Sequence, residues 1–83
     1  MPNTEPITHY PVSPEKTADL DNRFTYHVPK PGQPERYSIL RETARQLADT
    51  ILQATPQSRE QSAALTNLEQ AIFWANAAIA HNE

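Results

Sequence analysis

Two stretches of the chain repeat apolar side chains at the spacing of an amphipathic α-helix. Both series advance by steps of three and four residues, the period that places side chains on one helix face. At about 1.5 Å per residue, each predicted helix is about 30–35 Å long. The first series is Tyr37, Leu40, Ala44, Leu47 and Ile51, and the second is Gln61, Leu65, Leu68, Ile72, Ala75 and Ile79.

Boundary signals flank the first series. Pro34 suits a first helical turn, where its missing N–H costs nothing, and Glu35 complements the positive end of the helix dipole. The helix should end before Thr55-Pro56, because proline disfavours helical backbone in the residue that precedes it. These signals predict a helix from about residue 34 to 54.

The second helix has two candidate starts and should run to about His81. Either Thr55 caps it with Pro56 in first position, or Ser58 caps it and Gln61 completes a Ser-x-x-Gln box. Both leave a short connection, which makes the two helices antiparallel neighbours. The expected fold is all-α: a short N-terminal element plus a hairpin of two long antiparallel helices.

The N-terminal part is rich in proline, and seven of the eight prolines precede residue 35. We expect residues 1–20 to be a flexible or loosely docked tail, because they offer little apolar surface to offset the entropy of ordering. Residues 21–83 would be the helical-hairpin domain. Within it, Asp21 is a candidate cap for a short turn or helix that ends near His27, and residues 28–34 should form an extended or turning segment.

The end of the second helix is apolar nearly all the way round. Between Ala71 and Ala80 only Asn76 is polar, so one partner helix cannot cover this segment. Its small and aromatic side chains favour close packing against copies of the same chain, with Asn76 fixing the register. An alternative is that they contact the N-terminal element. The expected oligomer interface is Phe73, Trp74, Asn76, Ala77 and Ala78.

The composition of the chain argues against several classes of function. The chain has 83 residues, no cysteine, and three histidines without ligand spacing, so we expect no metal and no other cofactor. Its start is polar and proline-rich, and its longest apolar run is too short for a bilayer, which favours a cytoplasmic protein. A net charge of −3 argues against binding to DNA or RNA polymers. We find no catalytic signature and expect no enzyme.

Positive charge nevertheless collects between residues 23 and 45. Five basic residues oppose two glutamates there, a local balance of +3 that suits a small anion, although it also fits an ordinary solvated helix face. Arg41 and Arg45 are one helical turn apart and can address one phosphate. Tyr26 offers a flat face for stacking on a base, or is a core aromatic beside Phe24. The candidate ligand-binding residues are Tyr26, Lys30, Arg41, Thr43 and Arg45.

The chain resembles the phage anti-CBASS sponge family, whose helical-hairpin domain is shared with sponges that block Thoeris defence. The resemblance covers about residues 21–82. It is carried by Arg23-Phe-Thr-Tyr-His-Val-Pro-Lys-Pro-Gly32, Arg36-Tyr-Ser-Ile-Leu-Arg41, Ser58-Arg-Glu-Gln-Ser62 and Trp74-Ala-Asn-Ala-Ala-Ile-Ala80.

The resemblance implies a homo-hexamer that captures cyclic di- or trinucleotide immune messengers in the host cytoplasm without cleaving them. In the family, an aromatic residue stacks on a base, while a cation and a hydroxyl on the first long helix hold phosphate. By spacing these fall on Tyr26, Arg41 and Thr43, with arginine standing where family members carry lysine. Two other hypotheses are a sponge for the cyclic ADP-ribose signals of Thoeris and an adaptor hairpin that docks on a host or phage protein.

Overall fold

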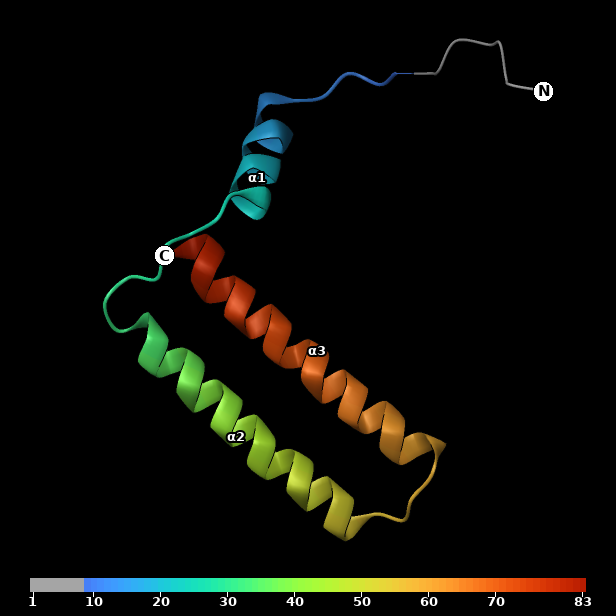
Figure 1. Cartoon of the computed structure of the whole chain (residues 1–83). Helices are drawn as coiled ribbons and strands as arrows, with labels where there is room; N and C mark the ends of the chain where they lie inside the picture. Colours follow the sequence, from blue (N-terminus) through green and yellow to red (C-terminus); the bar gives the residue numbers. More distant parts are fainter. Residues whose placement is uncertain (1–8) are drawn as a thin grey trace, which may run out of the picture.

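The computed structural model describes residues 9–83, and this part of the chain is all-helical. It consists of α1 (Pro14–Phe24), α2 (Gln33–Ala54) and α3 (Arg59–Asn82), without a strand among the described residues. The predicted all-α class is therefore confirmed. Figure 1 shows α2 and α3 as two long antiparallel helices side by side, with α1 beyond the end where α3 finishes and α2 begins.

Both long helices have nearly the predicted bounds. Helix α2 begins one residue before Pro34, with Gly32 as its N-cap in the left-handed conformation (φ 85°), which glycine adopts without steric cost. It ends at Ala54, before the Thr55-Pro56 pair. Its stripe of apolar residues packs against α3 to form the hairpin.

The turn between α2 and α3 uses the second predicted start. The hydroxyl of Ser58 accepts a hydrogen bond from the backbone N–H of Gln61 (3.1 Å). The Gln61 side chain does not reach back to Ser58; its Nε2 instead donates to the carbonyl oxygen and to Oγ1 of Thr55, both at 3.0 Å. Gln61 is 91 % buried and ties the end of α2 to the beginning of α3.

Helix α1 begins earlier than the sequence predicted. The hydroxyl of Ser13 caps it by accepting from the N–H of Lys16 (3.1 Å), and Pro14 and Glu15 occupy its first turn. Residues 14–20 are thus helical and not a structureless tail, and Asp21 lies inside the helix instead of capping it. Residues 1–8 of the expected tail lie outside the described part, and the division into two units at residue 20 remains a prediction.

A polar clasp closes the open end of the hairpin. The guanidinium of Arg36 on α2 donates to both carboxylate oxygens of Glu83, next to the end of α3. Gln33 is 96 % buried between them, donating to Glu83 Oε1 (3.3 Å) and accepting from the N–H of Lys30 (2.9 Å). These contacts lower the pKa of Glu83 to about 2, and the same carboxylate raises the pKa of Arg36.

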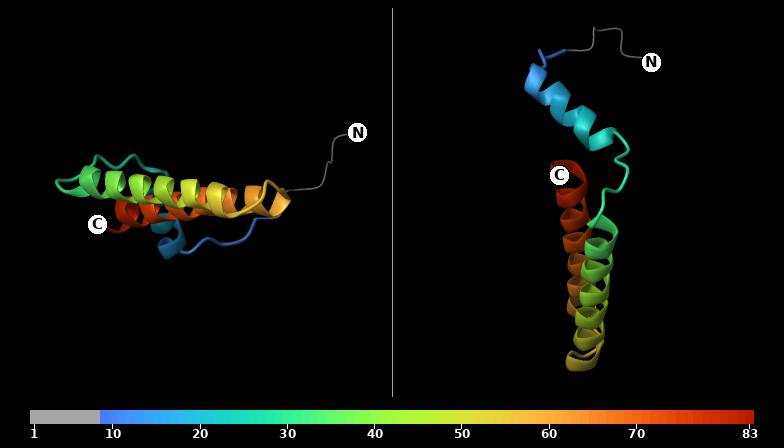
Figure 2. Two further views of the ribbon diagram at one scale, coloured as in Figure 1. Left: turned by 90° about the horizontal axis from the view of Figure 1, so that it is seen from below. Right: turned by 90° about the vertical axis from the view of Figure 1, so that its left-hand side faces the viewer.

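The hairpin has no dry core of its own. Among residues 9–83 no apolar side chain is fully buried, and the only buried side chains are the two glutamines at its ends. Helix α1 adds little cover, because it lies beyond the end of the hairpin in Figure 1 and in the right-hand view of Figure 2. Two helices can shield each other on one face only, so much apolar surface is left for another partner.

Candidate functional site

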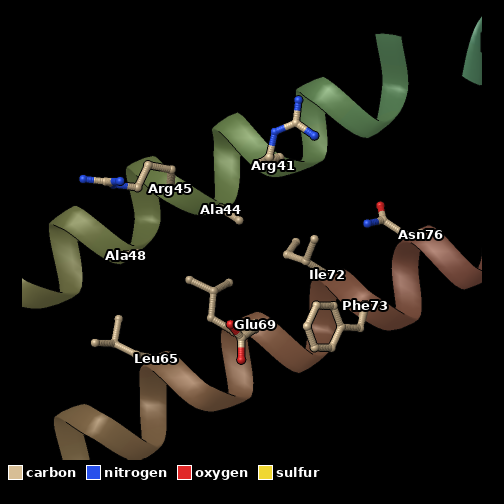
Figure 3. A pocket seen from close by; sticks show the side chains of 10 residues that line it. Arg41, Ala44, Arg45, Ala48, Leu65, Glu69, Ile72, Phe73 and Asn76 are labelled. Carbon is tan, nitrogen blue, oxygen red and sulfur yellow. The ribbon is translucent and has the colours of Figure 1, made fainter. Parts of the chain in front are cut away.

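A groove of about 470 Å³ runs along one face of the hairpin between α2 and α3 (Figure 3). Its floor is apolar, because alanines on α2 face leucine and isoleucine side chains on α3 and leave space between the helices. Its rims carry polar groups. The lining residues are Arg41, Ala44, Arg45 and Ala48 from α2, and Leu65, Leu68, Glu69, Ile72, Phe73 and Asn76 from α3.

Arg41 and Arg45 supply the positive rim of this groove. Arg41 is exposed and donates to Oγ of Ser38 (3.2 Å), while Arg45 forms an exposed ion pair with Asp49 (3.3 Å). Exposed pairs of this kind contribute about 0–1 kcal/mol, so an anionic ligand can replace Asp49 at little cost. The two side chains share a wall of the groove, but in Figure 3 their guanidinium groups extend in different directions.

The negative rim and an unpaired amide lie on the opposite wall. Glu69 is exposed on α3 and lines the wall of the groove opposite α2. Asn76 lies opposite Arg41 in Figure 3, and its Oδ1 is buried without a hydrogen-bond donor. A buried carbonyl oxygen without a donor costs about 1–3 kcal/mol. A donor from a ligand or from a second chain would remove that cost.

The other candidate ligand residues lie outside the groove of their own chain. Tyr26 is in the segment that joins α1 to α2, and its side chain is 82 % exposed, so it is not a core aromatic in this chain. Lys30 is in the same segment, near the clasp at Glu83. Thr43 is exposed on α2 but does not line the groove. One chain therefore brings together Arg41 and Arg45, but not Tyr26, Lys30 or Thr43.

The candidate interface residues divide between several hollows. Phe73 and Asn76 line the groove with the arginines, which the sequence pattern had not indicated. Trp74 and Ala77 line a second hollow with Phe73 and Gln70. They also line a third, which α1 borders, together with Asp19, Arg23, Phe24, Ala78, His81 and Asn82.

Helix α1 does not cover this part of α3. Trp74 remains 75 % exposed and Phe24 83 % exposed, although both line the same hollow. The contact between α1 and α3 is made instead by polar groups at their ends. Nδ2 of Asn22 donates to the carbonyl oxygen of His81 (2.8 Å), and the His27 and His81 rings lie 5.5 Å apart. The alternative that the N-terminal element buries Trp74 therefore does not hold within residues 9–83.

Other kinds of site find little support in the described residues. Between residues 9 and 83, no three His, Asp or Glu side chains lie together where they could hold a metal ion. No helix in that range has the length and apolar character needed to cross a membrane.

Comparison with known protein families gives one match. The family described as Acb2/Tad1, hairpin domain, matches residues 16–80, most of the chain. The chain belongs to this family. The match begins five residues before the resemblance noted from the sequence and includes most of α1. Searches of curated proteins and of solved structures gave no match.

Membership in the Acb2/Tad1 hairpin family indicates the general role of the chain. The family is that of the anti-CBASS and anti-Thoeris sponges, which indicates a phage anti-defence sponge role for the chain. It is not a known family of enzymes.

Proposed function

We propose that the protein sequesters cyclic dinucleotide immune messengers, and cyclic trinucleotides as a second ligand class, and so blocks CBASS signalling. The observation that carries the proposal is the rim of the groove. Arg41 and Arg45 stand one turn apart on the α2 rim of the groove, and both are exposed. Guanidinium groups bind phosphate oxygens with paired, charge-assisted hydrogen bonds.

In this proposal the complete pocket forms between subunits. Tyr26 stacks on a base, Arg41 holds phosphate, and Thr43, Arg45 and Lys30 add a hydroxyl and further positive charge. Tyr26 and Arg41 lie on different elements, and Tyr26 does not line the groove of its own chain. This separation within one chain supports a pocket that a second copy completes.

The proposed assembly is a homo-hexamer held by Phe73, Trp74, Asn76, Ala77 and Ala78, acting in the host cytoplasm. Its support is the large exposure of Phe73 and Trp74 together with the absence of a fully buried apolar side chain among the described residues. The proposed mechanism is capture without turnover. The residues that line the groove include no serine, threonine, cysteine or histidine.

Calorimetric titration with a panel of cyclic di- and trinucleotides tests the function. We expect saturable binding in the micromolar range or tighter, with the nucleotide recovered intact after the complex is denatured by heat. Absence of binding throughout the panel would overturn the messenger-sponge proposal. A chemically altered nucleotide in the eluate would overturn capture without cleavage.

A second candidate function is capture of the cyclic ADP-ribose signals of Thoeris, because the family name joins both kinds of sponge. Including these signals in the same panel separates the two. Binding of cyclic ADP-ribose isomers alone would favour this candidate. An adaptor hairpin would bind neither class and would be a monomer in light scattering.

A further inference from the structure

Helix α1 is amphipathic, but nothing within residues 9–83 covers its apolar stripe. It is the most amphipathic of the three helices, and none of its residues is buried. Thr17, Leu20 and Phe24 share one face, at steps of three and four residues. Leu20 is half exposed and Phe24 almost fully exposed. An amphipathic helix of 11 residues is marginal in water unless its apolar face packs against something.

The groove between α2 and α3 has the length of α1. Helix α1 has 11 residues, about 16 Å at 1.5 Å per residue. The groove extends along α3 from Leu65 to Asn76, also about 16 Å by the same rise. Its α2 wall contains Ala44 and Ala48, which are small enough to let another helix approach.

The charges of α1 match the two rims of the groove. On a helical wheel, Asp21 borders one edge of the Thr17–Leu20–Phe24 stripe, and Lys16 and Arg23 border the other. The groove has Arg41 and Arg45 on its α2 rim and Glu69 on its α3 rim. With its stripe facing the floor, α1 can turn Asp21 to the arginine rim and Lys16 to the glutamate at the same time, while Arg23 stays paired with Asp19 (3.0 Å).

We propose that α1 of one copy lies in the α2–α3 groove of a second copy. The proposal rests on the self-association proposed above, but not on the identity of the ligand. Because α-helices are right-handed, only one direction matches both charged rims, with α1 parallel to α3 of the receiving copy. Phe24 then lies toward Asn76, and Pro14 toward Leu65.

This direction completes the proposed pocket. Tyr26 follows Phe24 by two residues, so it arrives at the end of the groove where Arg41 faces Asn76. The docked helix fills the apolar floor, and Asp21 meets Arg45. The guanidinium of Arg41 is left for phosphate beside the newly arrived phenol ring. The matching lengths of α1 and the groove, and their complementary charges, do not depend on the ligand. They place the ring of Tyr26 beside the guanidinium of Arg41.

Contacts at the end of the hairpin keep α1 away from the groove of its own chain. Asn22 donates to the carbonyl oxygen of His81, and Nε2 of His27 is 2.7 Å from the carbonyl oxygen of Asn22. They fix the last turn of α1 beyond α3, and the rest of the helix extends away from the hairpin (Figure 1). Docking on its own groove would break the hydrogen bond between Asn22 and His81, whereas docking on a second copy need not.

Single cysteines can test the arrangement cleanly, because the chain has no cysteine of its own. One batch of full-length protein carries only Lys16→Cys and another only Glu69→Cys. The two are refolded together and treated with a short bifunctional maleimide. We expect a covalent dimer, because the proposed direction puts residue 16 near residue 69 of the neighbouring copy. Glu15→Cys is the matched control, since residue 15 lies on the opposite face of α1.

A several-fold higher dimer yield with Lys16→Cys than with Glu15→Cys would support the proposal. Equal yields in a protein that light scattering shows to be assembled would overturn α1 docking but not the sponge function. A monomer in light scattering would overturn both docking and the proposed assembly. A further variant carries both Lys16→Cys and Glu69→Cys in one chain. If cross-links form only within that chain, α1 folds onto its own groove, and the proposal is also overturned.

A charge exchange provides a second measurement. Lys16→Glu and Glu69→Lys should each weaken assembly by placing like charges together, and the double variant should recover most of the loss. Sedimentation measures the assembled fraction in all four proteins. If the losses simply add in the double variant, these two residues do not face each other and the proposed direction is wrong.

Discussion

Arg41 on α2 and Phe73 on α3 line the same groove from opposite helices. The sequence pattern assigned the first to ligand binding and the second to assembly, yet one surface contains both. A ligand held by Arg41 and a subunit packed on Phe73 would therefore be neighbours. Substitutions along this groove should be tested for binding and for assembly together.

Replacing Arg41 with alanine should weaken ligand binding and leave assembly intact. A charge-assisted contact contributes roughly 1.5–3 kcal/mol, so we expect about a 10- to 150-fold higher Kd in calorimetric titration. Thr43→Ala should cost less, about 0.5–1.5 kcal/mol for a neutral hydrogen bond. Arg59→Ala is the control, because Arg59 is exposed at the beginning of α3 and does not line the groove. An equal loss in the control would point to net charge as the cause.

Tyr26→Ala should lose about 1–3 kcal/mol of ligand binding, the usual value of an aromatic stack on a base. Its high exposure means that the free energy of unfolding of the hairpin should change by no more than about 0.5 kcal/mol. Mixing Tyr26→Ala with Arg41→Ala chains should restore part of the binding, because some pockets would receive both native residues. No recovery after subunit exchange would contradict a pocket shared between chains.

Trp74→Ala and Ala78→Arg should both shift the protein toward smaller species in light scattering. The first removes a large exposed contact side chain, and the second introduces an unpaired charge into a surface proposed to be covered. Gln46→Arg, on an exposed position of α2 outside the groove, is the charge-matched control. An unchanged oligomer for Ala78→Arg would place residue 78 outside the interface.

The carboxyl group of Glu83 should titrate with a pKa of about 2, below its ordinary value of 4.5, because Arg36 and Gln33 donate hydrogen bonds to its charged form. A lowered folded-state pKa means that the clasp contributes its full stabilisation above about pH 4.5 and loses it as the pH falls toward 2. NMR titration measures this value. In Arg36→Gln the pKa should move back up, and a value that stays low would exclude Arg36 as the cause.

Ser58→Ala should destabilise the hairpin by about 0.5–2 kcal/mol, the cost of losing an N-cap. Ser62→Ala is the matched control, because Ser62 is exposed one turn further along α3 and its hydroxyl caps nothing. Chemical denaturation of both variants measures the difference. Equal midpoints would mean that Gln61 alone holds the turn.

Local signals in the sequence were enough to predict the two long helices. The start and stop signals of these helices affect only the backbone within about one turn, so they do not depend on tertiary contacts. These signals are Pro34, the Thr55-Pro56 pair and Ser58. The start of α1 was missed for a related reason. The prediction for residues 1–20 rested on their overall composition. It therefore overlooked the local sequence Ser13-Pro14-Glu15, in which Ser13 caps the helix and the next two residues form its first turn.

The site was harder to predict from the sequence, because it depends on how two helices meet. The spacing of Arg41 and Arg45 correctly placed them on one surface. The membership of Phe73 and Asn76 in the same groove depends on the rotation of α3 against α2, which the apolar stripe fixes only loosely. Tyr26 cannot be placed against Arg41 from one chain at all, since the segment that bears it does not reach the groove.

The absence of a fully buried apolar side chain in residues 9–83 has a consequence for how the protein responds to dilution. If folding and association are coupled, stability depends on protein concentration by mass action. The melting temperature should then rise as the protein is concentrated, and the dilute chain should melt early and be open to proteolysis. The amount of folded, assembled protein would then rise steeply above a threshold concentration in the cell and would not increase in proportion to the amount expressed.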